Sequence, residues 1–395
     1  MAYFIICDSF APLNTSAAIQ MQDLCEEMAH QGQEVIVLTP YHGLDKNYKT
    51  NHNHDHNIKI LYFKTFGYRD KSKIKRFFGE IILPFYMIFK IIILKEKFQK
   101  IDGIIWYSPT IFFGPLIKFL KKKYKCKTYL IVRDIFPDWA LDMGLINNGL
   151  RYAFLKYVAN YQYKLANTIG VQSSGNLVFF EKFLNNKHQN VEILNNWLRL
   201  KSRTTCSIDL QNTILARKKI FIYSGNMGIA QCVSVLTDLA YNFRDNSDVG
   251  FLFIGRGSEL PALKKFCLIN KLDNVLFIDE INSEEIPALY DQCHVGLISL
   301  DSRHKSHNIP GKFISYIRSG LPVVALVNKD NDLIDLINSK QVGEACSNKL
   351  HLKQKAVSLL QKIDHDKNHQ ERCVDLYVKN YTAKAAVSQI MKSFN

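Results

Sequence analysis

Two glycine-rich turns in the second half of the chain each follow an apolar run and precede a helical pattern. The first reads Ser224-Gly225-Asn226-Met227-Gly228, and the second reads Gly255-Arg256-Gly257-Ser258-Glu259. Glycine lets a backbone approach an anion closely, and a helix that begins after such a turn offers unpaired N–H groups and the positive end of its dipole. The turns predict a cradle for a phosphate or pyrophosphate, bound by the following residues: Ser224, Gly225, Asn226, Gly228, Arg256 and Glu259.

Both turns also fit a ligand-free interpretation, in which each is a tight connection between a strand and a helix. In that case Arg256 faces solvent, and Glu259 is a first-turn acid that the helix dipole favours. The two interpretations remain open at the level of the turns alone.

A third segment adds a positive charge to the predicted anion site. Pro310-Gly311-Lys312 opens a helical pattern that ends at Gly320 and Pro322. Lys312 at the start of this helix could neutralise a phosphate that the helix dipole also attracts. We therefore predict that Pro310, Gly311 and Lys312 bind phosphate. The alternative for Lys312 is a solvated surface charge.

The most unusual segment of the first half is Arg133-Asp134-Ile135-Phe136-Pro137-Asp138-Trp139, directly after the apolar run 129–132. Charged and aromatic residues in a loop at the carboxyl end of a strand are typical of a site for a polar substrate. The alternative is a structural Arg133–Asp134 pair with Trp139 covering the core. Ser16 follows the first expected strand, where it either faces the same site or caps the next helix.

Apolar runs alternate with helical patterns along the chain, which is typical of parallel sheets covered by helices on both faces. The expected strands lie at 3–6, 34–39, 58–63, 103–107, 128–132, 168–172 and 191–194, then at 219–223, 250–254, 275–277, 295–298 and 322–325. Because 395 residues exceed one ordinary core, we predict an α/β protein with two doubly wound, Rossmann-like domains that face a cleft. The expected boundaries are 1–198 for the first domain, 199–217 for a linker, 218–375 for the second domain, and 376–395 for a C-terminal helix that crosses back to the first domain.

Lysine and arginine outnumber aspartate and glutamate by 51 to 36, a formal charge of +15. Such a surface should attract nucleic acid, phospholipid headgroups or phosphorylated small molecules. Nine cysteines without a Cys-x-x-Cys pair argue against a zinc site or redox dithiol and indicate reduced thiols in the cytoplasm. His52, His54 and His56 alternate in a polar stretch, where a loop is favoured over a metal site. We expect no metal, no cofactor and no secretory signal.

Residues 68–100 are basic at both ends and aromatic or aliphatic in between. The most apolar part, 81–94, contains Pro84 and Lys90 and is shorter than the roughly 20 residues that span a bilayer. Together with a second basic cluster at 118–125, this segment predicts a surface that lies in the headgroup region of an anionic membrane. The alternative is a buried helix with solvated lysines.

In their order and spacing, several segments together resemble the family-four retaining glycosyltransferases of the GT-B fold, in the branch that builds bacterial surface polysaccharides. These segments are 8–16, 32–39, 133–140, 170–173, 195–197, 223–228 and 309–312. Within that branch the chain is most similar to the N-acetyl-L-fucosamine transferases of O-antigen and capsule loci. The resemblance implies a UDP-linked 6-deoxy-amino sugar as donor, bound mainly by the second domain. It also implies a saccharide acceptor on a polyprenyl diphosphate carrier.

The sequence departs from the family pattern at the nucleotide site. The family carries two glutamates eight positions apart, where this chain has His307 and Ser315. The resemblance therefore implies that Ser315, or a residue from another loop, holds the ribose. The family's Arg and Lys near the first glycine turn are also absent, which leaves Lys312 and Arg256 as the leading phosphate partners.

During such a transfer negative charge grows on the leaving phosphate, so fixed hydrogen-bond donors at that phosphate should contribute most. We assign this role to Lys312 and the backbone of 225–228. Asp134 is the candidate that orients or deprotonates the acceptor hydroxyl, with Arg133 holding it and Asp138 as the second choice. If the reaction retains configuration, the leaving oxygen itself can take the acceptor proton. This scheme needs no metal.

Two other functions fit part of the pattern. A UDP-sugar 2-epimerase would use the same fold without an acceptor or a membrane, and His307 and Glu280 leave this open. A non-enzymatic protein that binds membranes or nucleic acid would explain the charge directly, but no nucleic-acid module is recognised. We therefore expect an enzyme in the cytoplasm, peripheral on the inner face of the membrane, without a nucleic-acid partner.

Overall fold

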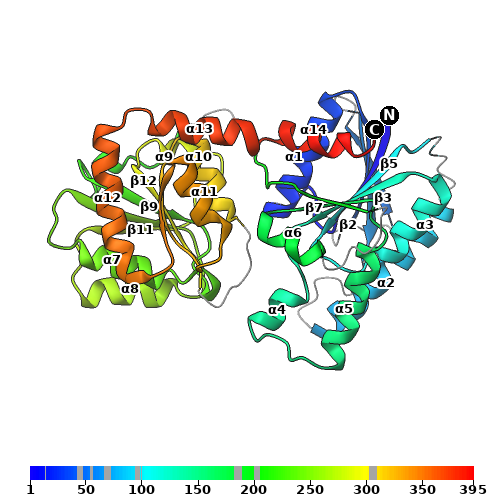
Figure 1. Cartoon of the computed structure of the whole chain (residues 1–395), viewed down its shortest axis with the longest axis horizontal. Coiled ribbons are helices and arrows are strands. Elements are labelled where there is room, and N and C mark those ends of the chain that lie inside the picture. The colour runs from blue at the N-terminus through cyan, green and yellow to red at the C-terminus, as the bar shows by residue number, and fades with distance from the viewer. Residues whose placement is uncertain are drawn as a thin grey trace. The chain divides into compact units, whose positions relative to one another are not determined.

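The computed structural model divides the chain into two compact units (Figure 1). Unit 1 comprises Met1–Trp197 and Ala383–Asn395, and unit 2 comprises Leu198–Thr382. The described residues are 1–13, 15–41, 48–53, 57–65, 73–93, 98, 100–181, 189–199, 205–301 and 309–395, without the side chains of 48–53 and 73–74. His54 and His56, the side chain of His52, and His307 lie outside this description.

Unit 1 is built on an eight-stranded sheet in the order β3-β4-β2-β1-β5-β6-β7-β8. Its strands are β1 (Ala2–Ile6), β2 (Glu34–Tyr41), β3 (Tyr48–Asn53), β4 (Ile58–Lys64), β5 (Gly103–Ser108), β6 (Lys127–Val132), β7 (Thr168–Val171) and β8 (Asn190–Ile193). All neighbouring strands run parallel except β3, which pairs antiparallel with β4 at the edge. The sequence did not predict β3, because 48–53 is a polar run without an apolar face.

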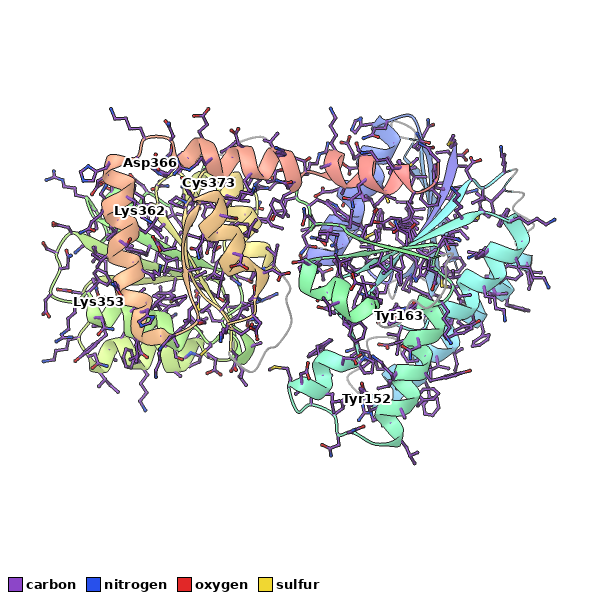
Figure 2. The ribbon with its side chains drawn as sticks, viewed as in Figure 1. Tyr152, Tyr163, Lys353, Lys362, Asp366 and Cys373 are labelled. Carbon is purple, nitrogen blue, oxygen red and sulfur yellow. The ribbon has the colours of Figure 1, made fainter. Side chains whose placement is uncertain are left out.

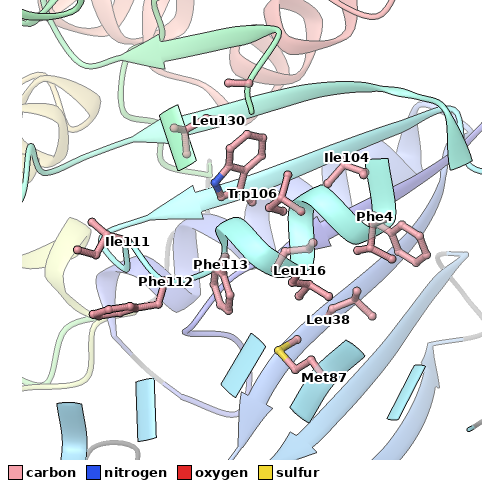
Figure 3. Packing of buried hydrophobic residues seen from close by; sticks show 14 of the residues in the cluster. Phe4, Leu38, Met87, Ile104, Trp106, Ile111, Phe112, Phe113, Leu116 and Leu130 are labelled. Atoms are coloured by element: carbon pink, nitrogen blue, oxygen red, sulfur yellow. The ribbon is translucent and has the colours of Figure 1, made fainter. Parts of the chain in front are cut away.

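Helices cover both faces of this sheet. They are α1 (Ser16–His30), α2 (Lys73–Ile93), α3 (Gly114–Tyr124), α4 (Asp138–Asp142), α5 (Leu150–Tyr163), α6 (Ser174–Glu181) and α14 (Ala383–Lys392). Alternate residues of β1 enter different cores: Phe4 packs with α2 and α3, whereas Ile5 packs with α1 and α14. Figure 3 shows the first of these cores, with Met87 of α2 and Leu116 of α3 among side chains of the strands.

Unit 2 is built on a six-stranded, wholly parallel sheet in the order β11-β10-β9-β12-β13-β14. Its strands are β9 (Lys219–Ser224), β10 (Val249–Ile254), β11 (Val275–Ile278), β12 (Val295–Ser299), β13 (Val323–Leu326) and β14 (Gly343–Cys346). Its helices are α7 (Ser234–Asn242), α8 (Leu260–Ile269), α9 (Ile286–Tyr290), α10 (Gly311–Arg318), α11 (Asp332–Lys340), α12 (Leu352–His365) and α13 (His369–Asn380), with short 3-10 turns η2 (Leu210–Asn212), η3 (Ile229–Gln231) and η4 (Lys349–His351). Two separate cores again lie on opposite faces of the sheet.

The structure confirms the predicted α/β class with two doubly wound sheets. The stretch 199–217, suggested as a linker by the sequence, falls in unit 2, where Leu210 and Leu215 are fully buried. The expected helical tail is two helices, α13 and α14, that are separated at Tyr381 and Thr382. After this break α14 packs on unit 1, and the Phe394 ring meets the edge of the Tyr3 ring at 5.2 Å.

Candidate functional site

The sheet of unit 2 changes direction between β9 and β12, because β10 and β11 extend it on one side and β13 and β14 on the other. Ligands of such sheets bind outside the carboxyl ends of the strands at this switch point. The loops that follow β9 and β10 and the start of α10 lie at these ends. These are the three segments that the sequence predicts as the anion site.

The two glycine turns pack directly on one another. Gly225 donates its N–H to the Ile254 carbonyl at 2.8 Å, and Met227 donates to the Arg256 carbonyl at 2.7 Å. Gly257 has a φ of +156°, and a Cβ there would collide with the Met227 backbone. The glycines of the second turn therefore serve the contact between the loops. Gly225 and Asn226 of the first turn remain exposed.

The helix expected after the first glycine turn is α7, which begins at Ser234. The 3-10 turn η3 comes first, and Cys232 follows with a φ of +47°. The Gln231 side chain accepts a hydrogen bond from the Gly228 N–H at 3.2 Å and one from the Asn226 amide at 2.9 Å. The Gly228 N–H is therefore satisfied within the loop, several residues before the start of α7.

Lys312 lies in the first turn of α10, above the glycine turn. Its ammonium nitrogen is 4.8 Å from the centre of the Tyr223 ring, and its last carbon lies 3.3 Å from where a Cβ of Gly225 would be. Burial lowers the pKa of Lys312 to about 8. No carboxylate contributes to this shift among the groups that the structure describes, so the cation is held in the site without a counter-ion.

The other predicted residues of unit 2 have different environments. Ser224 is buried, and its hydroxyl bonds to the Tyr290 hydroxyl, so its side chain faces the interior. Arg256 is exposed and lies 3.2 Å from Glu280, as expected for a residue that faces solvent. Glu259 is the residue before α8, and Pro310 is the residue before α10. Gly311 is exposed at the start of α10, and Ser315 is half-buried one turn after Gly311.

In unit 1 Arg133 and Asp134 differ in burial. Arg133 is buried, donates to the Leu194 carbonyl at 2.9 Å, and lies 4.6 Å from the centre of the Trp197 ring. Burial lowers its pKa to about 10. Asp134 is exposed. Arg133 thus supports the chain that follows β8, whereas Asp134 is the member of the pair that a substrate can reach.

Asp138 makes contacts within the protein, whereas Ser16 is exposed. Asp138 accepts from the Lys156 ammonium at 2.6 Å and from the Tyr152 hydroxyl at 3.0 Å. These bonds join α4 to α5, the helix on which Figure 2 labels Tyr152. Burial and the neighbouring Asp138 carboxylate raise the pKa of Tyr152 to about 12. Ser16 is the exposed first residue of α1, and the cap of this helix is Thr15, which accepts from the Ala18 N–H.

Sequence reasoning missed two residues at the switch point of unit 1, which lies between β1 and β5. Asp8 is half-buried just after β1, and Tyr107 is buried near the end of β5. Burial, then the charges of Asp134 and Asp8, raise the pKa of Tyr107, which the Arg133 cation opposes. The carboxylates of Asp8 and Asp134 therefore both lie close enough to the Tyr107 hydroxyl to affect its pKa, at the carboxyl ends of these strands. The position of Asp8 directly after the first strand was the available signal.

Helix α2 presents an apolar stripe to solvent. Five side chains, each 53–57% exposed, recur at helical spacing: Phe78, Ile82, Phe85, Phe89 and Ile92. The opposite face, with Leu83 and Met87, is buried. The Phe77 ring contacts Phe154 of α5 at 6.2 Å, and Phe154 and Tyr157 add exposed aromatic surface. Lysines of α3 are exposed nearby in the same unit, although Lys121 is half-buried and donates to the Leu165 carbonyl.

None of the helices in the described ranges has both the length and the apolar content needed to cross a membrane. We call the five exposed side chains of the stripe the α2 surface.

Comparison with known proteins bears on unit 2 first. Residues 218–362 match the family described as glycosyl transferases group 1. This region resembles the group 1 glycosyltransferases. It contains both glycine turns and Lys312. The colanic acid biosynthesis glycosyl transferase WcaI of Escherichia coli strain K12 is 25% identical over 218 residues, which cover 51% of this chain and 52% of WcaI. The chain thus spans about half the length of the curated relative that it matches.

Solved structures extend the likeness to both units. Sucrose-phosphate synthase of Thermosynechococcus elongatus has a TM-score of 0.72 at 13% identity and covers 99% of this chain and 97% of its own. Anabaena HepE in complex with UDP has a TM-score of 0.69 at 13% identity and covers 100% and 99%. WaaG, a glycosyltransferase involved in lipopolysaccharide biosynthesis, has a TM-score of 0.65 at 12% identity and covers 99% of both chains. The fold is therefore GT-B, with the group 1 region in unit 2.

Proposed function

We propose that the chain is a glycosyltransferase that moves a sugar from a UDP-sugar to a lipid-linked saccharide in the synthesis of a bacterial surface polysaccharide. The observation that carries this proposal is the Lys312 cation, which lies over Gly225 at the switch point and has no carboxylate partner among the described residues. A diphosphate would supply the missing negative charge. The group 1 match over this region and the UDP in the structure of HepE support a nucleotide donor.

In this proposal Lys312 stabilises the charge that grows on the leaving phosphate, in a site where burial strengthens the interaction. The exposed backbone of Gly225 and Asn226 is the second contact with the diphosphate. Ser315, on the same helix as Lys312, is the candidate for the ribose. The names of WcaI and WaaG support a role in surface polysaccharide synthesis. We propose an N-acetylated 6-deoxy-amino sugar, such as N-acetyl-L-fucosamine, as the donor sugar, transferred with retention.

The direct test is a thermal-shift screen of the whole chain with nucleotides and nucleotide sugars, followed by a transfer assay. A nucleotide that binds only the folded state raises the midpoint of unfolding. We expect UDP to raise the midpoint more than GDP or ADP, and UDP release from the UDP-sugar to require a polyprenyl-diphosphate saccharide. Conversion of the UDP-sugar to its 2-epimer without an acceptor would instead identify an epimerase. The absence of any nucleotide effect would exclude both enzymes.

The pKa of Lys312 predicts how UDP binding depends on pH. Burial lowers the pKa of the free site to about 8. The protonated form, which attracts phosphate, therefore predominates below pH 8 and is lost above it. We expect the Kd of UDP to rise about tenfold per pH unit well above the pKa that Lys312 has in the free protein. Isothermal titration from pH 7 to 9.5 measures this rise, and an equal rise in Lys312→Met would assign the titration to another group.

Asp134 is proposed to orient the acceptor hydroxyl or take its proton. Asp134→Asn keeps the shape of the side chain and removes its charge, so we expect kcat to fall by about 10²-fold or more, while the Kd of UDP stays within twofold. Steady-state kinetics and UDP titration measure the two effects. Asp138→Asn is the matched control, because Asp138 binds Lys156 and Tyr152. Its loss should lower the unfolding midpoint and change kcat little. Unchanged kcat in Asp134→Asn would remove Asp134 from the reaction.

The α2 surface is proposed to dock on the inner face of the cytoplasmic membrane, where a lipid-linked acceptor resides. The exposed apolar stripe would enter the headgroup region, and the exposed lysines of α3 would meet anionic headgroups. Docking through α2 would bring the enzyme to a membrane-bound acceptor.

A further inference from the structure

The strand ladder between β9 and β12 ends before β9 does. β12 pairs with β9 only at Phe221 and Ile222, whereas β10 follows β9 as far as Ser224. Backbone groups of a strand alternate in direction, and the Gly225 N–H points toward β10, where it donates to Ile254. The Ser224 N–H therefore points toward β12, beyond the last paired residue. The ladder with β12 leaves this N–H without a strand partner.

A side chain takes the place of that partner. The Tyr316 hydroxyl accepts a hydrogen bond from the Ser224 N–H at 3.1 Å and donates one to the Ile222 carbonyl at 3.1 Å. The Tyr316 ring comes from α10 and lies against β12 at Gly296, where a Cβ would overlap the ring. Gly296 thus gives the phenol room to pass β12 and reach the end of β9. Tyr316 thus supplies the hydrogen bonds that β9 lacks where it diverges from β12 at the switch point.

The same helix carries the cation of the site. Lys312 precedes Tyr316 by four residues, so the two side chains project from the same face of α10. Lys312 reaches the Tyr223 ring and Gly225, directly beside the Ser224 peptide that Tyr316 holds. A second buried phenol, Tyr290, bonds the Ser224 hydroxyl, and its ring lies 5.1 Å from that of Tyr316. The glycine turn and the lysine are therefore attached to one another through Tyr316.

We propose that Tyr316 is a positioning residue for the donor diphosphate: its hydroxyl fixes the end of β9 to α10 and so sets Lys312 over Gly225. This inference rests on the proposed function, because it assumes that UDP is the ligand of this site. Tyr316 itself does not touch the ligand. Loss of its hydroxyl leaves the buried Ser224 N–H without an acceptor and lets the turn shift against the helix, and a shift of 1 Å costs much of a well-placed ionic contact.

The test is Tyr316→Phe, with UDP affinity measured by isothermal titration at pH 7. We expect the Kd to rise at least tenfold. The matched control is Tyr377→Phe in the same unit: Tyr377 is also fully buried, and its hydroxyl donates to the Leu198 carbonyl at 2.8 Å. Both variants lose one buried phenol hydroxyl and should lose similar stability, but the control should bind UDP within twofold of the unsubstituted chain.

A double-variant cycle separates positioning from general damage. If Tyr316 acts through Lys312, Tyr316→Phe should weaken UDP binding less than threefold when Lys312 is already methionine. Retained UDP affinity in Tyr316→Phe beside lost affinity in Lys312→Met would overturn this inference alone, as would full additivity of the two variants. Failure of the unsubstituted chain to bind UDP would contradict the proposed function and this inference together.

Discussion

Replacing Lys312 by methionine is expected to lower kcat/KM for sugar transfer by about 10²- to 10³-fold while the fold stays intact. Removing one preorganised group that faces developing charge typically costs this much. Lys312 is the cation that meets the glycine turn, since the turn itself carries none and Arg256 is exposed and paired with Glu280. Methionine keeps the length and apolar stem of the side chain, so packing against Tyr223 should survive.

Stability gives this variant a second readout. Burial lowers the pKa of Lys312 from 10.5 to about 8 in the folded chain, so the unfolded chain binds the proton more tightly. The buried charge therefore lowers the free energy of unfolding by its full amount below pH 8. This penalty disappears as the pH rises toward 10.5. Lys312→Met removes the penalty, and its unfolding midpoint at pH 7 should equal or exceed that of the unsubstituted chain.

Initial rates of UDP release and thermal unfolding measure the two effects in one preparation. Lys265→Met, an exposed lysine on α8, is the matched control and should change neither. Full transfer activity in Lys312→Met would take this residue out of the mechanism. Lost activity together with a strongly lowered midpoint would indicate a structural role.

Removing the apolar stripe should abolish membrane docking. In the triple variant Phe85→Ser, Phe89→Ser and Ile92→Ser, we expect the affinity for vesicles that contain anionic phospholipid to fall at least about 10²-fold. Fully burying one such side chain contributes about 1.5–3 kcal/mol, so three partly inserted side chains contribute several kcal/mol. Each is more than half exposed, so the fold should stay intact. Transfer to a lipid-linked acceptor should fall in parallel.

Vesicle co-sedimentation measures this affinity, and UDP titration checks that the donor site is unchanged. The matched control is Leu268→Ser with Ile269→Ser, because these exposed side chains of α8 lie in unit 2, outside the α2 surface. Unchanged vesicle binding in the triple variant would refute docking through α2. Stronger binding of the unsubstituted chain to DNA than to vesicles would favour a nucleic-acid partner instead.

Local patterns were sufficient to predict most of the fold. Apolar runs bounded by turns predicted twelve of the strands, with ends within a residue or two, because parallel strands buried on both faces are apolar throughout. The edge strand β3 is polar, and β14 (Gly-Glu-Ala-Cys) is not an apolar run, so neither gave this signal. The break between α13 and α14 was also missed, because residues 369–394 continue a helical pattern across it.

The chemical identity of the candidate site was likewise a local property. A lysine after Pro310-Gly311 and a glycine turn after a strand could be recognised from neighbouring residues, since helix starts and turns depend on a few adjacent positions. The roles of Arg133 and Asp138 could not, because Leu194 lies 61 residues from Arg133 and Lys156 lies 18 residues from Asp138. The side chains of Arg133 and Asp138 are therefore used in contacts within the protein.

The sequence by itself determined the two doubly wound sheets and predicted an anion site near Gly225 and Lys312. Only the tertiary structure decided that Lys312 has no carboxylate partner in the described part of the chain, that Arg133 is buried while Asp134 is exposed, and that Tyr316 reaches β9 past Gly296. The physical reason is that burial and hydrogen bonding depend on segments brought together by the fold. Residue type and spacing specify which groups a loop offers, but packing across strands decides which of them remain available to a ligand.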